Sequence, residues 1–407
     1  LMGQAVGSWN AVSRDPTRHE SGQRELLPAP GTKLALACCA SRASFAAVTS
    51  QLLRRLSTQG VSRRYDLHLI VVHAKVDRLN LSGLAASADL QTLTIIELES
   101  NSYATRRNQA LATALEADCR YLFFYDDDEH WVRPIFHADK TVGWRHSDPL
   151  VPHLAGLAAG AVITCGVTLG QVSPVPWILP QQTDPRYLVD LGHALRFGSE
   201  FLHRRSFVED AGRWRCRPSC RLDAPMLRRR GILPLTGGNL AIDLRAMRAG
   251  RIPPYYNPPL ARGEDALLGA RVRHLPVRRV SACSFHDPFG RMHCAEDGEP
   301  MSMAAQTPDP DQALQRFADA LCGWVGYAPL LVRLGGGLRI GLSGAQRLET
   351  LQRVIDDVGA PIAQDLGCPQ LTGLSALLHA RRQAVTLDHE QMRQQAARWP
   401  GYRVVSD

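Results

Sequence analysis

The sequence predicts an α/β protein built on a mostly parallel sheet flanked by helices, with a helical extension at its C-terminal end. Between residues 33 and 125, short apolar runs alternate with amphipathic helical segments, which is the pattern of an open α/β sheet. One of these runs, 121–125 (YLFFY), passes directly into four consecutive acids. Ligands of such sheets bind beyond the carboxyl ends of the strands, so we expect a functional site at these acids.

The composition is that of a globular enzyme. The chain has 407 residues, of which 45% are hydrophobic and 21% are charged, so one large domain with an appendage and two domains are both open. The formal net charge is +8, and the arginines cluster at 204–205, 228–230 and 278–279. Such a surface suits anionic partners, namely nucleic acid, an anionic membrane face or phosphorylated substrates; a solvated surface without a partner is the alternative.

The cysteines and the apolar runs indicate a cytoplasmic protein. Ten cysteines stand at irregular positions and form no disulfide framework, which favours a reducing compartment. Cys216 and Cys220 lack the second pair that a zinc site needs. No apolar run is long enough to span a bilayer and no signal-peptide pattern is present, so we expect no membrane insertion.

The elements before the acids follow in a regular order. Residues 1–31 are polar, without an apolar period, and are expected to form a flexible N-terminal arm. Strands are expected at 33–39, 66–72, 93–98 and 121–125. A helix is expected from Ser44, because Phe45, Val48, Leu52 and Leu56 share one face, and a second helix is expected over 104–116.

The chain after the acids changes character twice. Further strands are expected at 161–167 and 279–285, with a helix opened by 262–265 between them. Residues 170–232 are rich in Pro, Arg and aromatic residues with poor periodicity, so we expect a long surface excursion that contacts a substrate. Beyond residue 308 helices are expected at 311–323, 344–358, 371–384 and 388–398. The chain thus divides into the arm 1–31, an α/β domain at 32–305 and a helical region at 306–407.

The acids that follow 121–125 indicate a cation site. Adjacent carboxylates repel one another and destabilise a strand end unless a cation lies there. Asp126 and Asp128 share one face of an extended chain, and Mn²⁺ and Mg²⁺ take oxygen ligands. We therefore expect these two side chains to bind Mn²⁺ or Mg²⁺, with a solvated acidic turn as the alternative.

Three further motifs stand in order around the acids. A basic helix start, 105–108 (TRRN), precedes them; Gly237-Gly238-Asn239 and then Glu264-Asp265 follow them, with His286 after that. In this order and spacing the set resembles the GT-A-fold glycosyltransferases, in particular the large family-2 group of inverting enzymes. The resemblance covers roughly residues 33–290, and it implies a GT-A (Rossmann-like) catalytic domain at 32–305 with 170–232 on the acceptor side.

The resemblance implies a hexosyltransferase-type enzyme that moves a sugar from a nucleoside diphosphate to a hydroxyl acceptor. Asp126 and Asp128 would hold the metal ion on the donor diphosphate, with His286 as third ligand and nearby His293 as its competitor.

The Glu264-Asp265 pair is the expected catalytic set. Asp265 would be the general base that takes the acceptor's proton, so that one attack inverts the anomeric carbon. The alternative for Glu264 and Asp265 is a pair of acids favourable at a helix N-terminus.

Donor binding is expected from positions that match the family's motifs. These are Ala40, Ser41, Arg42, Asp77, Arg106, Arg107, Asp126, Asp127, Gly237, Gly238 and Asn239. Arg106 and Arg107 would meet donor phosphates or else form a solvated helix face, while Asn108 secures the helix start. The glycines allow a close backbone approach of the sugar, or form a plain tight turn. The family's acid after the second strand is matched only by the displaced Asp77, which leaves the donor base open.

The acceptor side and the partners complete the prediction. Trp131, Trp177 and Trp214 are the expected sugar-stacking platforms, with core packing as the alternative. The expected partners are a nucleotide-sugar donor, UDP-sugar ahead of GDP-sugar, and a hydroxyl-bearing acceptor. For the helical tail, three roles are open: shaping the acceptor site, a homodimer contact, or a peripheral contact with an anionic membrane.

Other classes fit the sequence less well. A retaining GT-A transferase, in which Asp265 positions substrates, shares the metal motif. A nucleotidyltransferase would have a Gly-rich basic loop after the first strand, which 40–44 (ASRAS) is not. A non-catalytic nucleotide-sugar-binding module would tolerate loss of the acids that are present here. A nucleic-acid-binding protein would interleave basic and aromatic residues on one element, whereas these arginines are scattered.

Overall fold

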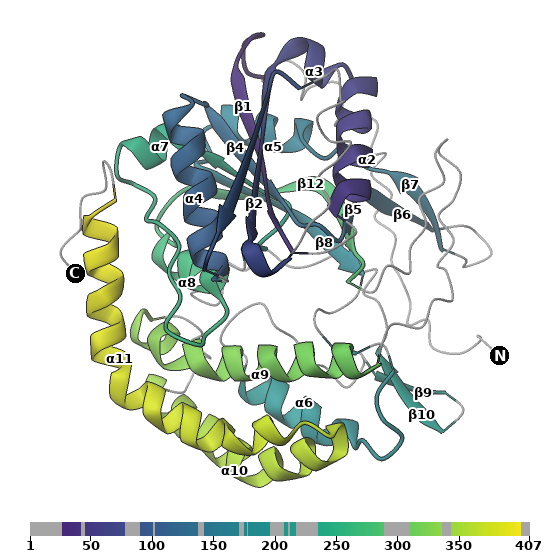
Figure 1. Ribbon diagram of the computed structural model, residues 1–407, viewed down its shortest axis with the longest axis vertical. Helices are drawn as coiled ribbons and strands as arrows, with labels where there is room; N and C mark the ends of the chain where they lie inside the picture. Colours follow the sequence, from purple (N-terminus) through teal and green to yellow (C-terminus); the bar gives the residue numbers. More distant parts are fainter. Residues whose placement is uncertain are drawn as a thin grey trace.

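Figure 1 presents the computed structural model of the chain. It describes residues 27–41, 45–77, 90–100, 102–136, 142–170, 175–176, 178–195, 207–210, 212–216, 235–288, 310–335 and 343–399. An α/β body surrounds one large sheet, and a layer of helices lies below it in this view. The N-terminal arm predicted at 1–31 falls mostly outside the described residues.

The central sheet is mostly parallel. Across the described residues it contains, in spatial order, β3 (Thr92–Leu98), β2 (Asp66–Ala74), β1 (Lys33–Ala40), β4 (Tyr121–Tyr125), β11 (Leu240–Asp243), β8 (Ile163–Gly170), β12 (Val277–His286) and β5 (Glu129–His130). The first four of these run parallel to one another, and β8 and β12 form another parallel pair. Strand β11 lies antiparallel between β4 and β8, and β5 is antiparallel to β12. The predicted fold class is thereby confirmed.

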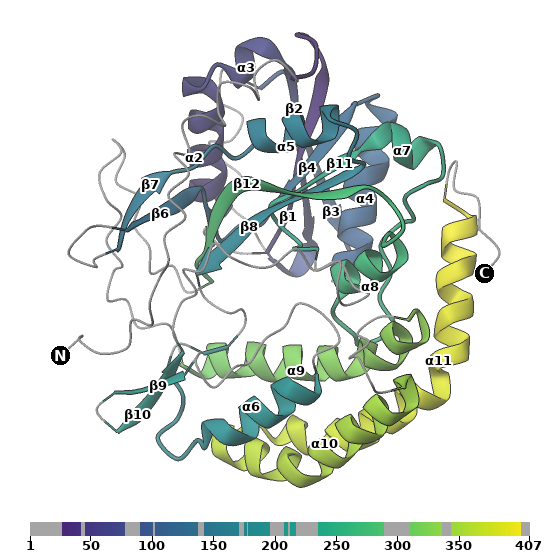
Figure 2. The ribbon, with the colours of Figure 1, turned by 180° about the vertical axis from the view of Figure 1, so that it is seen from behind.

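Helices cover both faces of this sheet, and this is why its inner strands are continuous apolar runs. Residues 34–40 of β1 and all of β4 are buried. Helices α2 (Phe45–Thr58), α3 (Val61–Arg64) and α5 (Val151–Ala158) contribute to the apolar cluster on one face. Helices α4 (Tyr103–Glu116), α7 (Leu244–Arg248) and α8 (Glu264–Arg271) contribute to the cluster on the other. In Figures 1 and 2 helices α2 and α4 lie on opposite sides of the strands.

Short elements complete the α/β body. The turn η2 (Lys75–Asp77) follows β2. Strands β6 (Val132–Phe136) and β7 (Val142–His146) form one antiparallel pair, and β9 (Phe207–Asp210) and β10 (Arg213–Cys216) form another.

The lower layer consists of α6 (Pro185–Ala194), α9 (Pro310–Arg333), α10 (Gly344–Leu366), η6 (Pro369–Gly373) and α11 (Leu374–Ala397). Their apolar residues form one large cluster, which includes Leu188 of α6, Phe317 of α9 and Leu351 of α10. The predicted C-terminal helical extension is confirmed. Helix α6, however, comes from the stretch 170–232 that we expected to be irregular; Asp184 caps it, and its leucines hold it on the extension.

The C-terminal helices are longer than periodicity alone predicted. Helix α9 continues past Gly323 because most of the residues that follow, from Trp324 to Leu331, are apolar and buried against the layer. The helices expected at 371–384 and 388–398 form one continuous helix, α11. None of the described helices is long and apolar enough to cross a membrane.

Candidate functional site at the carboxyl end of β4

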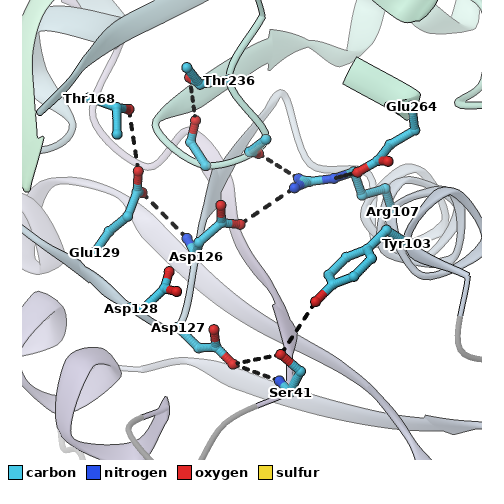
Figure 3. A network of polar contacts seen from close by, with 12 residues as sticks. Ser41, Tyr103, Arg107, Asp126, Asp127, Asp128, Glu129, Thr168, Thr236 and Glu264 are labelled. Carbon is cyan, nitrogen blue, oxygen red and sulfur yellow. Dashed lines mark hydrogen bonds and ion pairs between the residues drawn. The ribbon is translucent and has the colours of Figure 1, made fainter. Parts of the chain in front are cut away.

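The sheet topology brings motifs that are distant in sequence together at the carboxyl end of β4. Strands β1 and β4 run parallel with Cys38 opposite Tyr125, so Ser41 and the acids 126–129 leave the sheet side by side. The turn 237–239 precedes β11. Because β11 is antiparallel to β4, with Leu240 opposite Phe124, this turn also lies at the carboxyl end of β4. Figure 3 shows the resulting polar network.

Arg107 is the centre of this network. It lies on the first turns of α4, where its side chain is nearly fully buried and its guanidinium is 5.1 Å from the ring centroid of Phe124. Its Nη1 donates to the carbonyl of Gly237 at 2.5 Å, its Nη2 to Asp126 at 3.4 Å, and its Nε to Glu264 at 3.3 Å. One guanidinium thus joins three of the motifs found in the sequence (Figure 3).

The first two acids after β4 have different partners. Asp126 pairs with Arg107 and its side chain is 33% exposed, so it faces both the network and solvent. Asp127 is buried and its Oδ2 accepts from the main-chain N–H of Ser41 at 2.6 Å and from the Ser41 hydroxyl at 3.3 Å. Asp127 therefore fixes the chain after β1, and the Ser41 hydroxyl lies 3.5 Å from that of Tyr103.

The next two acids face strand β12. The Oδ2 of Asp128 lies 3.3 Å from Nε2 of His286. Glu129 is 1% exposed and accepts from Ser284 at 3.0 Å and from Thr168 at 3.4 Å, while its other oxygen accepts from the N–H of Asp126 at 3.4 Å. Glu129 thus holds Asp126 to β8 and β12.

These acids concentrate negative charge. Burial raises the pKa of Asp126, and Asp128 adds to the rise while Arg107 opposes it. Burial also raises the pKa of Glu129 to about 8, with further contributions from Asp126 and Asp128. A further positive charge beside these acids, at the carboxyl end of β4, would therefore be stabilised.

The side chains at this site are of types that bind a divalent cation, but the three expected ligands, Asp126, Asp128 and His286, do not come together. Asp128 and His286 form a carboxylate–imidazole pair of the kind that Mn²⁺ accepts. Asp126 turns to Arg107 instead. Across the described residues, no three His, Cys, Asp or Glu side chains are arranged to hold a metal ion by themselves. An ion held by this pair would need further ligands, which water or a substrate can supply.

The glycines at 237 and 238 are required by the close approach of charged side chains. A Cβ on Gly237 would lie 2.3 Å from Nη2 of Arg107. A Cβ on Gly238 would lie 2.4 Å from Oε2 of Glu129 and 2.9 Å from Cγ of Asp126. No side chain fits at either position without moving the network.

Glu264 and Asp265 open α8 with different surroundings. Glu264 is buried, and it accepts from Arg107 and from Asn257 at 3.2 Å. Burial acts to raise its pKa, but Arg107 and these hydrogen bonds bring the pKa below its usual value. Asp265 is half-buried and accepts from the N–H of Ala266 at 2.8 Å. Glu264 therefore orients Arg107, while its neighbour is the carboxylate more accessible to a substrate.

Asn239 corrects the sequence-based prediction of a donor contact. It adopts a left-handed conformation, with φ of 50°, and is fully buried. Its Oδ1 lies 2.9 Å from Nε2 of His153, and its Nδ2 donates to Ser284 at 3.1 Å and to the carbonyl of Ala282 at 3.2 Å. Asn239 fastens β11 to β12 and α5 and presents nothing to a ligand.

The prediction that Arg106 binds donor phosphates is also corrected. It is fully buried, and its Nη1 lies 3.1 Å from both the carbonyl of Ala40 and Oδ2 of Asp77. Asp77 also accepts from the N–H of Ala74 at 2.9 Å. The pair ties the ends of β1 and β2 together, so Arg106 is not a phosphate ligand, and Ala40 contributes its carbonyl to this tie.

Asn108 is tied to a segment beyond its own helix. It exchanges hydrogen bonds of 2.9 and 2.8 Å with the main chain of Tyr255. It therefore fastens α4 to the segment before α8 as well as lying near the helix start.

Trp131 and Trp214 pack in apolar clusters instead of joining the polar network. Trp131 is 1% exposed and packs on Phe123 with ring centroids 5.4 Å apart, so it belongs to the core. Trp214 packs against the helical layer. Trp177, Arg42 and His293 lie outside the described residues.

Sequence reasoning missed Glu129 and Tyr255. Glu129 was only the last of four acids, and its role depends on β8 and β12, which lie beside it only in the folded sheet. Tyr255 is buried, with its ring centroid 5.7 Å from the Arg107 guanidinium carbon. The run of prolines and tyrosines at 253–256 (PPYY) was the only local signal.

Comparisons with known proteins find structural similarity at low sequence identity. The sequence matches no protein-family model and no curated protein. Among solved structures the chain is similar to residues 1–349 of S. aureus TarS (12% identity, TM-score 0.34, covering 88% of this chain and 91% of that one). It is also similar to TarS 1–349 in complex with UDP-GlcNAc (11%, 0.33, 88% and 92%). A third similar structure is GalNAc-T7 with UDP, GalNAc and Mn²⁺ (11%, 0.33, 91% and 59%).

Proposed function

We propose that the chain is a metal-dependent glycosyltransferase of the inverting family-2 type, which moves a sugar from a nucleoside diphosphate to a hydroxyl acceptor. The observation that carries the proposal is the set of contacts made by Arg107. Through this one side chain the acids after β4, the turn at Gly237 and the start of α8 at Glu264 meet in one buried network. A merely solvated acidic turn would not require such a construction.

Asp128 and His286 are the groups proposed to hold Mn²⁺ or Mg²⁺. Such an ion supplies stabilisation of the negative charge that grows on the departing diphosphate. Asp126 stands next to this pair and is kept in place by Arg107 and Glu129. Gly238 allows the turn at 237–239 to lie directly against the carboxylates of Asp126 and Glu129.

Asp265 is the proposed base. Its carboxylate takes the proton of the acceptor hydroxyl while that oxygen forms a bond to the anomeric carbon. The bond from the anomeric carbon to the diphosphate breaks, and the nucleoside diphosphate leaves with the electron pair, so the configuration inverts. Glu264 stays ionised against Arg107, which separates the roles of these adjacent acids.

Two alternatives share the same geometry. In a retaining transferase Asp265 would orient the acceptor without taking its proton. In a non-catalytic module the network would bind a nucleotide sugar and release nothing. Product stereochemistry separates the first from inversion, and turnover separates the second.

The test measures nucleotide release from UDP-sugars and then GDP-sugars, with Mn²⁺, with Mg²⁺ and with EDTA. Asp128→Ala and Asp265→Asn are compared with wild type, and Asp357→Ala on the exposed face of α10 serves as a matched surface control. We expect metal-dependent turnover that falls at least about a hundredfold in both site variants and not in the control. Calorimetry on the same panel follows, and a folded protein that binds no nucleotide sugar would contradict the proposal.

A further inference from the structure

The loop that leads into α8 is shaped by helix α9. The main-chain N–H of Arg262 donates to the carbonyl of Gly323 at 3.3 Å. A Cβ on Gly323 would lie 2.8 Å from the Cβ of Arg262, and a Cβ on Gly263 would lie 2.6 Å from the ring of Tyr327. Gly263 has a φ of 132°, which L side chains rarely adopt. The helical layer therefore fixes where residue 262 stands.

The side chain of Arg262 extends from this loop over Tyr103. Its guanidinium carbon is 5.5 Å from the ring centroid, and Arg106 contacts the same ring at 5.3 Å. The Tyr103 hydroxyl lies 3.5 Å from the Ser41 hydroxyl, which in turn donates to Asp127 (Figure 3). Arg262 thus stands at the edge of the network, beside the chain that follows β1.

Arg262 differs from the other arginines of this region in its partners. Arg106 is paired with Asp77, and Arg107 with Asp126 and Glu264. The guanidinium of Arg262 makes no hydrogen bond or ion pair with any residue that the structure describes; it lies over the Tyr103 ring and helps to lower the pKa of Glu264 through its charge. A guanidinium that is held on an aromatic ring, with no hydrogen-bond acceptor among the described residues, is pre-organised for an anionic ligand.

We propose that Arg262 is a substrate-binding residue that holds the diphosphate of the nucleotide donor. This inference rests on the function proposed above. The departing nucleoside diphosphate carries more negative charge than one divalent ion offsets, and Arg106 and Arg107 are already paired with carboxylates. Arg262 presents planar N–H donors that match phosphate oxygens in pairs. Its place beside Ser41 favours the donor over an anionic group on the acceptor.

The test is calorimetry of UDP and of uridine, and of GDP and guanosine, in the presence of Mn²⁺ and without acceptor. Wild type is compared with Arg262→Gln and Arg262→Lys. Arg278→Gln is the matched control. It removes the same charge from an exposed position at the start of β12, the opposite end of that strand from His286. Thermal unfolding of each variant verifies that the loop change leaves the fold intact.

We expect Arg262→Gln to raise the Kd of the diphosphate about ten- to a hundredfold and to leave that of the nucleoside unchanged. Arg262→Lys should retain part of the affinity, since it keeps the charge and loses the paired donors. Equal losses for diphosphate and nucleoside would overturn the inference and make Arg262 a purely structural loop residue. Unchanged diphosphate binding in Arg262→Gln would overturn it too, and leave the transferase proposal standing. Wild type that binds no nucleotide would overturn both.

Discussion

Two polar networks lie next to each other at the ends of β4, β8, β11 and β12, and they differ in charge and in exposure. The network of Arg107 joins an arginine to acidic side chains, and its Asp126 is 33% exposed. The network of Asn239 consists of neutral groups, with His153, Thr164 and Ser284 as its partners, and all of these side chains are fully buried. They meet at Ser284, which accepts from Asn239 and donates to Glu129.

The division runs through one tripeptide. Gly237 and Gly238 border the charged network, whereas the next residue, Asn239, points its side chain into the neutral one. Consecutive residues at the start of a strand point to opposite sides, so a motif that is contiguous in sequence is divided in space. The charged side is suited to bind and change a ligand, and the neutral side is suited to hold the strands that carry it.

The largest expected effect is from Arg107→Met, which removes the charge and keeps much of the volume. Glu264 and Asp126 would remain as buried or half-buried carboxylates without their cation, so we expect a loss of about 3–5 kcal/mol in the free energy of unfolding. Donor turnover should fall to background. Urea unfolding and nucleotide release are the measurements.

Arg107→Lys is the matched control for that variant. A lysine keeps the charge but cannot reach three acceptors in one plane, so stability should be partly restored and turnover should stay low. If Arg107→Met unfolds at the same urea concentration as wild type, the network is not the electrostatic centre described here.

The second effect concerns the neutral network. Asn239→Gly keeps the left-handed backbone and removes the side-chain bonds to His153, Ser284 and the main chain. We expect a loss of about 4 kcal/mol in unfolding free energy, because several buried groups lose their partners together. Turnover per folded molecule should stay near wild type. A marked rise in the KM for the donor would instead show that Asn239 contacts the donor.

The third effect is a pH dependence of the neutral network. Burial lowers the pKa of His153 to about 4 from an ordinary value near 6.5. Between these values the unfolded chain binds a proton that the folded chain does not, so stability falls as the pH is lowered from about 6.5 to about 4. The full contribution is about 3 kcal/mol.

Denaturant unfolding at pH 7, 5 and 4 measures this contribution. His153→Gln cannot be protonated, so its stability should decline less over the same range. The difference between the two slopes is the prediction, because other histidines and the carboxylates titrate in both proteins. Parallel slopes would show that His153 is already protonated in the folded protein, or that burial does not lower its pKa.

The sequence indicated what local patterns determine and missed what strand pairing determines. The strands 33–39 and 121–125, the acids that follow and the helix start at Arg107 could be predicted, because apolar runs and charge clusters are local. The burial of Trp131 and Asn239 could not, since Trp131 packs in a cluster with β1, α2 and α5, and Asn239 bonds to α5 and β12, and these elements meet only in the folded protein. Helix α6 was missed because its leucines have no apolar neighbour until α9 and α10 are present.

The smallest expected effect separates Gly238 from Asn239 directly. Gly238→Ala places a methyl group against Glu129 and Asp126, whose carboxylates must shift by a few tenths of an ångström or more. We expect donor turnover to fall about tenfold, which corresponds to about 1.4 kcal/mol in the barrier, with little change in unfolding free energy. Gly373→Ala is the control, since no atom lies within 4 Å of its added Cβ. The opposite pattern, lost stability with intact turnover, would assign Gly238 to the neutral network and move the border between the two networks to Gly237.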